Sequence, residues 1–345
     1  MDELINIFVI GVRTGAIYAL IALGLALVFK ATKVLNFAHG EIGTSSAFVS
    51  LFIMERMEAL SIFSSADNPG TLTGGQLLVS VIPALLAGAM LSVMVKVILD
   101  RLKDSTPVTQ LVLTIGVAVF MVGLQAKLFG VTGDPFPRFI NGNAFTIPGS
   151  TIPVDWHTII IVVVLGGAAA LLALYFKTPY GVALLATSQD PFAAELQGIN
   201  TNAITMSAWA VAGAMAGAAG LLAAGVFNLL GPGLLLARFL IPAFTGALLG
   251  GLTSMVGAVV GGLLLGVIVA TANQINLTLD LGLPGPPQIA VLMSLLLVLL
   301  LRPRGLLGKE ALDVGRRHRS GPPAHALGHH DHPPVRAAAT PRRGA

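Results

Sequence analysis

The strongest constraint on this chain is a long stretch of sequence with almost no charge. From Leu196 to Leu301 the only charged side chains are Arg238 and Asp280. A helix needs about 20 apolar residues to cross a hydrocarbon core of about 30 Å, so this stretch is long enough for several crossings. The whole chain shares the bias, since 55% of its 345 residues are hydrophobic and 10% are charged. These features exclude a water-soluble domain and predict an all-α, polytopic helical bundle in a membrane.

Further apolar segments precede this stretch, at residues 4–29, 40–54, 76–95, 105–126 and 158–176. Arg13 interrupts the first one, and we expect it either to reach toward the membrane surface or to pair with another helix. Residues 239–279 are about twice the length of one span, and Gly250 and Gly251 lie inside them. We therefore expect two shorter membrane segments there, as a hairpin or a re-entrant pair. The total is about eight or nine membrane segments.

The placement of lysine and arginine predicts the orientation, because cytoplasmic loops are enriched in both residues. One side of the expected bundle carries Lys30, Lys33, Lys96, Arg101, Lys103, Lys177, Arg302, Arg304 and Lys309. The loops of the other side carry only Arg56 and Arg138, among several acidic residues. The N-terminus is therefore expected outside and the C-terminus in the cytoplasm. Such an arrangement requires an odd number of crossings.

The sequence divides into a transmembrane domain, residues 1–310, and a tail, residues 311–345. The tail consists mainly of Pro, Gly, Ala, Arg and His without apolar periodicity, so we expect it to be disordered and cytoplasmic. Its histidines 329, 330 and 332 are a weak metal-binding candidate, because a flexible tract has no neighbouring groups to fix their geometry. No metal site is expected in the rest of the chain.

No pattern of residues predicts an enzyme. The sequence has no cysteine, no serine in a G-x-S-x-G pattern, and no two carboxylates in one buried segment. The segment from Gly305 to Glu310 lacks the spacing of a phosphate-binding loop, so this chain is not expected to bind ATP or any other cofactor itself. Pairs of small residues four positions apart, such as Gly11 with Gly15 and Gly262 with Gly266, predict closely packed helices.

A polar motif, Asn36-Phe-Ala-His39-Gly-Glu41, stands where the second apolar segment begins. Ionisable groups at membrane depth usually face protein or water, so these residues either line a solute path or cap the helix. We expect the candidates for the path to be Asn36, His39, Glu41, Ser45, Gln110, Thr114 and Ser254. Hydrogen bonds between helices are the alternative role for each of them.

A second informative segment predicts a very short helix between Asp190 and Gly198. Asp190 is a good N-cap, Pro191 suits the first helical position, and Gly198 suits the residue just past the end. Phe192 and Leu196, four positions apart, form a small apolar face. Because so short a helix is not stable alone, this face should dock either on a partner protein or on the bundle itself.

Five segments together resemble a known family: residues 11–24, 36–41, 189–200, 213–220 and 246–262. They resemble the LivH-type permeases of ATP-binding-cassette importers for branched-chain amino acids, over roughly residues 5–308. The resemblance implies a permease that pairs with a second related permease, two cytoplasmic ATPases that bind ATP, and an extracytoplasmic solute-binding protein. It also implies an ATPase-coupling loop formed by Asp190, Pro191, Phe192, Ala194, Leu196, Gly198, Ile199 and Asn200.

Two other functions stay open on the sequence. Related permeases are associated with urea and short amides, so the solute is not fixed by the resemblance. An ATP-independent secondary transporter or channel would need a buried carboxylate or a broken helix for an ion, and Glu41 and Asp280 are the candidates.

Overall fold

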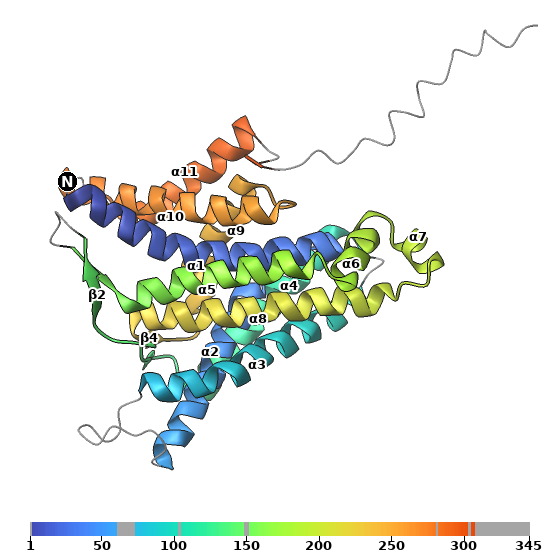
Figure 1. The fold of residues 1–345 in the computed structure, drawn as a ribbon, viewed down its shortest axis with the longest axis horizontal. Helices are drawn as coiled ribbons and strands as arrows, with labels where there is room; N and C mark the ends of the chain where they lie inside the picture. Colours follow the sequence, from blue (N-terminus) through green and yellow to red (C-terminus); the bar gives the residue numbers. More distant parts are fainter. Residues whose placement is uncertain are drawn as a thin grey trace, which may run out of the picture. The chain divides into compact units, whose positions relative to one another are not determined.

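Long apolar helices dominate the structure, as the uncharged segments predict (Figure 1). The computed structural model describes residues 2–60, 73–102, 105–147, 152–280, 282–302 and 305–307. Within them, six helices are long and apolar enough to cross a membrane: α1 (Asp2–Thr32), α3 (Gly74–Asp100), α4 (Pro107–Phe129), α5 (Trp156–Tyr175), α8 (Thr201–Phe227) and α10 (Met255–Thr278). The shorter apolar helices are the π-helix η1 (Leu236–Leu240), which continues into α9 (Ile241–Gly250), and α11 (Pro286–Leu301). The chain is a polytopic helical membrane protein.

The remaining elements are polar or very short. Helix α2 (His39–Ala59) is apolar in part but is not among the six, because it carries His39 and Glu41 at its start and Glu55, Arg56 and Glu58 at its end. Two small helices, α6 (Pro179–Gln189) and α7 (Pro191–Leu196), follow α5. The described strands form two antiparallel pairs, β1 (Asp134–Pro135) with β4 (Leu229–Leu230), and β2 (Asn143–Thr146) with β3 (Pro153–Asp155). The expectation of an all-α fold omitted these strands, which are too short to show a strand periodicity.

The break at Gly250 and Gly251 is confirmed, but its two arms are unequal. Gly251 has a φ of 104°, a conformation that favours glycine, and Ser254 then caps α10 by accepting the N–H of Gly257 at 3.0 Å. The second arm, α10, has 24 residues, enough for a full span, whereas the first arm, η1 with α9, covers only residues 236–250. The prediction of two shorter segments is therefore wrong for the second arm. The tail, residues 311–345, lies outside the described residues.

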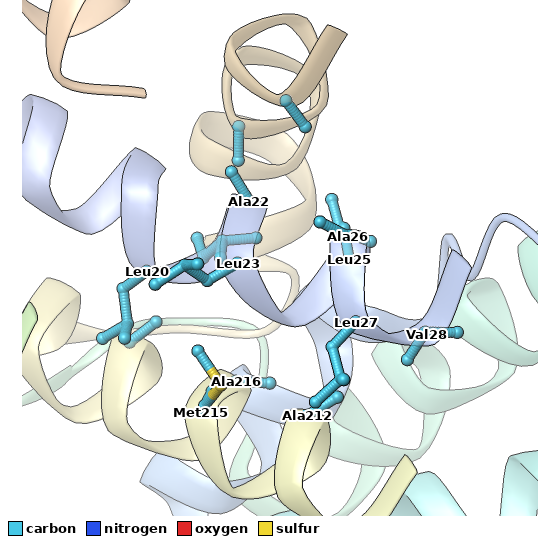
Figure 2. Close-up of a cluster of buried hydrophobic side chains, with 14 of the residues drawn as sticks. Leu20, Ala22, Leu23, Leu25, Ala26, Leu27, Val28, Ala212, Met215 and Ala216 are labelled. Carbon is cyan, nitrogen blue, oxygen red and sulfur yellow. The ribbon is translucent and has the colours of Figure 1, made fainter. Parts of the chain in front are cut away.

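Helix α1 is the centre of the packing. Its residues from Gly15 to Val28 are almost all buried, against α5, α8, α9 and α10. Figure 2 shows Leu20 and Leu27 directed toward α8, where Met215 and Ala212 lie. Because α1 contacts helices from both halves of the sequence, its apolar side chains join them into one core.

Glycines permit the close contact between α1 and α10. A Cβ on Gly262 would collide with the backbone of Ala19, and one on Gly266 would collide with Gly15 Cα and the carbonyl oxygen of Gly11. The two helices therefore touch backbone to backbone, which agrees with the four-residue spacing of these glycines.

Arg13 has a partner on another part of the chain, one of the two roles expected for it. Arg13 Nη1 lies 3.9 Å from Asp155 Oδ2, and Arg138 Nη1 lies 3.4 Å from the same oxygen. Burial alone would raise the pKa of Asp155, but hydrogen bonds from Thr158 and the charges of both arginines hold it below its usual value. Arg138 also donates to the carbonyl oxygen of Gly225 at 3.3 Å. This cluster ties α1, α5 and α8 together at the end where the strands lie.

Matched alanine substitutions test the glycine contact. Gly266→Ala should lower thermal stability by about 1–3 kcal/mol, as overpacking does, because the new methyl group meets backbone. Gly166→Ala is the control, since nothing lies within 4 Å of a Cβ at that position of α5, and it should be neutral or stabilising by up to about 1 kcal/mol. Thermal unfolding of the purified chain in detergent measures both. Equal stabilities of the two variants would contradict the backbone contact.

Candidate functional site

Helix α2 begins inside the bundle. Residues 39–44 are fully buried, and α2 runs obliquely to the nearly parallel α1, α5 and α8 (Figure 1). The residues before it are held by side chains: Asn36 Oδ1 accepts the N–H of Ala38 at 3.0 Å, and Thr114 Oγ1, on α4, accepts the N–H of Phe37 at 3.2 Å. The polar motif thus lies in the interior, where irregular backbone needs such partners.

A second helix begins at the same place. The helical segment that contains η1 and α9 starts at Leu234, so the N–H groups of its first turn have no partner within the helix. The N–H of Leu236 donates to Glu41 Oε1 at 3.0 Å, and that of Leu235 donates to Thr44 Oγ1 at 3.2 Å. The N–H of Gly233 donates to Gln125 Oε1 at 3.2 Å. Side chains from α2 and α4 therefore cap a helix that begins in the interior.

The charge of Glu41 fits this position. A helix N-terminus carries a partial positive charge of about half an elementary charge, which stabilises a nearby carboxylate. Glu41 also accepts the hydroxyl hydrogen of Thr44 at 3.4 Å, and Gln125 Nε2 donates to Ser45 Oγ at 2.9 Å. Asn36 and Thr114 thus hold the start of α2, and Glu41, Thr44, Ser45 and Gln125 lie at the start of the second helix; together with His39 we call these residues the interior cluster.

Part of the interior cluster has no partner in the described protein. The buried atoms are His39 Nδ1 and Nε2, Asn36 Nδ2 and Glu41 Oε2. The imidazole of His39 lies against Gly24, where a Cβ would collide with the ring. Buried polar atoms without partners are rare in folded proteins, and their concentration within six positions marks this cluster as the candidate functional site.

The structure brings together Asn36, His39, Glu41, Ser45 and Thr114 from the expected path but separates two other residues from them. Gln110 Nε2 donates to the carbonyl oxygen of Leu102 at 3.2 Å, and Ser254 caps α10. Thr44 and Gln125 were not among the residues predicted from the sequence. Thr44 follows Glu41 by three positions and shares its helix face, and Gln125 is a polar residue in an otherwise apolar stretch. Both signals were readable.

The short helix α7 forms as its caps predict. Asp190 Oδ1 accepts the N–H of Ala193 at 3.0 Å, and Gly198 has a φ of 80°. Phe192 and Leu196 are each 71% exposed, so their face does not dock on this chain, one of the two alternatives left open. The buried side chain of α7 is Ala194. Of the other residues in the expected coupling loop, Pro191 begins α7 and Ile199 packs against the core.

Asn200 has a defined structural role in this loop. Its side chain caps α8 by accepting the N–H of Ala203 at 3.0 Å. Glu195 accepts the hydroxyl hydrogen of Thr201 at 2.6 Å, which joins α7 to the start of α8. In Figure 1, α7 lies at the end of the bundle opposite to β2 and β4.

Within the described ranges, no three His, Asp or Glu side chains are placed to hold a metal ion. The tail histidines 329, 330 and 332 lie outside those ranges.

Comparison with known proteins identifies the family. Residues 7–301 match the model of the branched-chain amino acid transport system permease component. The high-affinity branched-chain amino acid transport system permease protein LivH of Salmonella typhimurium is 28% identical over 308 residues, covering 88% of this chain and 95% of the relative. The corresponding protein BraD of Pseudomonas aeruginosa is 28% identical over 322 residues, covering 91% and 97%.

A more distant relative and the solved structures complete the comparison. The probable branched-chain amino acid transport permease protein LivH of Methanocaldococcus jannaschii is 25% identical over 254 residues, covering 72% of this chain and 74% of the relative. No solved structure matches the chain. The family match and the six apolar helices place the chain in the bacterial inner membrane as a multi-pass protein. The chain belongs to the family of branched-chain amino acid transport system permeases.

Proposed function

We propose that this chain is the permease subunit of an ATP-binding-cassette importer. It translocates branched-chain or related hydrophobic amino acids, which a solute-binding protein delivers on the extracytoplasmic side. A second related permease completes the membrane part, and two cytoplasmic ATPase subunits bind the ATP. The family match over residues 7–301 carries this proposal, and the exposed apolar face of α7 supports it.

The proposed orientation places the N-terminus outside and the end of α11 in the cytoplasm. Basic residues support it: Lys96 and Arg101 belong to the C-terminal end of α3, and Lys177 follows α5. Both helices end toward the side of the bundle that carries α7 (Figure 1). We propose eight or nine membrane segments: the six long helices, η1 with α9, α11 and the partly polar α2. In this arrangement α7 faces the cytoplasm, where an ATPase can reach it.

Transport would use the two helices that begin in the interior. Discontinuous helices in transporters typically meet at the solute or ion site, where their unsatisfied backbone groups are accessible to side chains or solute. Here the starts of α2 and of the 234–250 helix meet at Glu41. Movement of α8, driven through α7, would shift α2, because these two helices pack against each other.

A gradient-driven carrier is the second candidate, because Glu41 is a buried carboxylate at the start of a broken helix. Such a carrier needs no ATPase. Its uptake would follow ion gradients and would not change when the α7 face is altered.

Single cysteines test the orientation, because the natural chain has none. Asn200→Cys should be protected from a membrane-impermeant maleimide applied to intact cells, whereas Ile140→Cys, at the other end of the bundle, should react. Asn68, also expected outside, lies beyond the described residues. Labelling of position 200 with protection of position 140 would invert the proposed orientation.

Removal of the α7 face tests the importer. Burial of a Phe or Leu side chain contributes about 1.5–3 kcal/mol, so Phe192→Ala with Leu196→Ala should weaken ATPase binding by about one to two orders of magnitude. The double variant should insert normally, because both side chains are exposed. Co-purification of the ATPases and solute-stimulated ATP hydrolysis are the measurements.

Leu174→Ala is the control for that experiment, since Leu174 is also exposed but lies on the membrane helix α5. It should leave ATPase binding unchanged. If the double variant keeps both ATPase binding and stimulated hydrolysis, α7 is not the coupling element. If the native chain binds no ATPase and its uptake tracks an ion gradient, the carrier replaces the importer.

A further inference from the structure

Arg238 is a charged residue in the apolar second half of the chain, and it has no counter-charge in the described protein. It lies on η1, and its guanidinium packs over the ring of Phe227, 4.8 Å from the ring centroid. The ion pairs among the described residues involve Arg13, Lys96 and Arg138, and none involves Arg238. Arg238 is exposed. A charged side chain among membrane-spanning helices that has no paired group usually faces water, often on a solute path.

Arg238 opens onto a cavity of about 520 Å³, within the range that small-molecule sites occupy. The cavity lies between α1, η1, α10 and the start of α11, and the last residue of α8 also lines it. Its polar lining includes the amides of Asn273 and Gln288, and its apolar lining includes Tyr18 and Phe239. Tyr18 and Phe239 pack edge to face with their centroids 5.7 Å apart, which gives the apolar side a fixed shape.

We propose that this cavity binds an amino acid with an aliphatic side chain, and that Arg238 binds its carboxylate. The proposal rests on the importer function proposed above and names a solute site within it. A guanidinium binds a carboxylate through two parallel hydrogen bonds, and amide oxygens accept hydrogen bonds from an ammonium group. The apolar side accommodates an aliphatic side chain. A simple inorganic anion would use the arginine alone and leave the apolar lining without a role.

The position of Arg238 connects this cavity to the interior cluster. Arg238 follows Leu236 by two residues on the π-helical turn, and the N–H of Leu236 is the group that Glu41 accepts. A π-helical turn is a rare element that occurs frequently at functional sites. A solute bound to Arg238 would therefore act on the same turn that α2 holds from the other side.

Charged thiol reagents test the site in the full chain reconstituted in liposomes. Gln274→Cys introduces a cysteine into the cavity at a lining residue to which the proposal gives no contact with the solute. Its modification by anionic sulfonatoethyl and cationic trimethylammonioethyl methanethiosulfonate is followed by intact-mass spectrometry. Ile275→Cys is the control, because Ile275 is exposed on the same helix but does not line the cavity. We expect Arg238 to favour the anionic reagent at position 274, and millimolar L-leucine to slow the reaction there but not at position 275.

Substitution of the arginine then gives the decisive comparison. With Arg238→Gln, the preference for the anionic reagent should disappear. The L-leucine concentration needed for protection should rise about ten- to hundredfold, because the loss of a charge-assisted hydrogen bond weakens binding by that factor. Leucinamide, which lacks the carboxylate, should protect the introduced cysteine poorly even when Arg238 is present. Equal protection by leucinamide, or unchanged protection by L-leucine in Arg238→Gln, would overturn the proposal. Neither measurement depends on ATP. Protection by L-leucine in a chain that binds no ATPase would therefore support this site and refute only the proposed importer function.

Discussion

The backbone N–H groups at the start of the 234–250 helix must find acceptors inside a membrane protein, and this requirement organises the interior. An unsatisfied backbone group in hydrocarbon costs several kcal/mol, so a helix can begin there only where side chains or cavities meet it. Glu41, Thr44 and Gln125 supply three acceptors from two other helices. The polar residues of α2, which lower its hydropathy, are the residues that allow another helix to begin.

The other features of the fold support this arrangement. The glycines of α10 let it contact α1 backbone to backbone, and the apolar face of α1 joins helices from both halves of the chain. The helix held by Glu41 carries Arg238 into a cavity, while α7 presents an exposed apolar face at the end of α8. In the importer that we propose, the face of α7 and the cavity at Arg238 would therefore act on neighbouring helices.

Local patterns were predictable from the sequence, and long-range contacts were not. The caps of α7 and the break at Gly250 and Gly251 depend on residues within one turn, so they were readable directly. The hydrogen bond from Leu236 to Glu41 joins residues 195 positions apart, and no periodicity reports such a contact. The unequal arms around the break were also missed, although Gly231-Pro-Gly233 directly precedes the first arm and marks its start.

Hydrogen exchange of the peptide that spans residues 231–240 tests the central claim most directly. In the native chain the amides of Leu235 and Leu236 should exchange slowly, because buried side chains accept their hydrogens. Thr44→Val together with Gln125→Leu removes two of the three acceptors and should speed exchange in this peptide, while peptides from α1 stay protected. Unchanged exchange at residues 231–240 in a folded double variant would contradict the claim that these side chains hold the helix start.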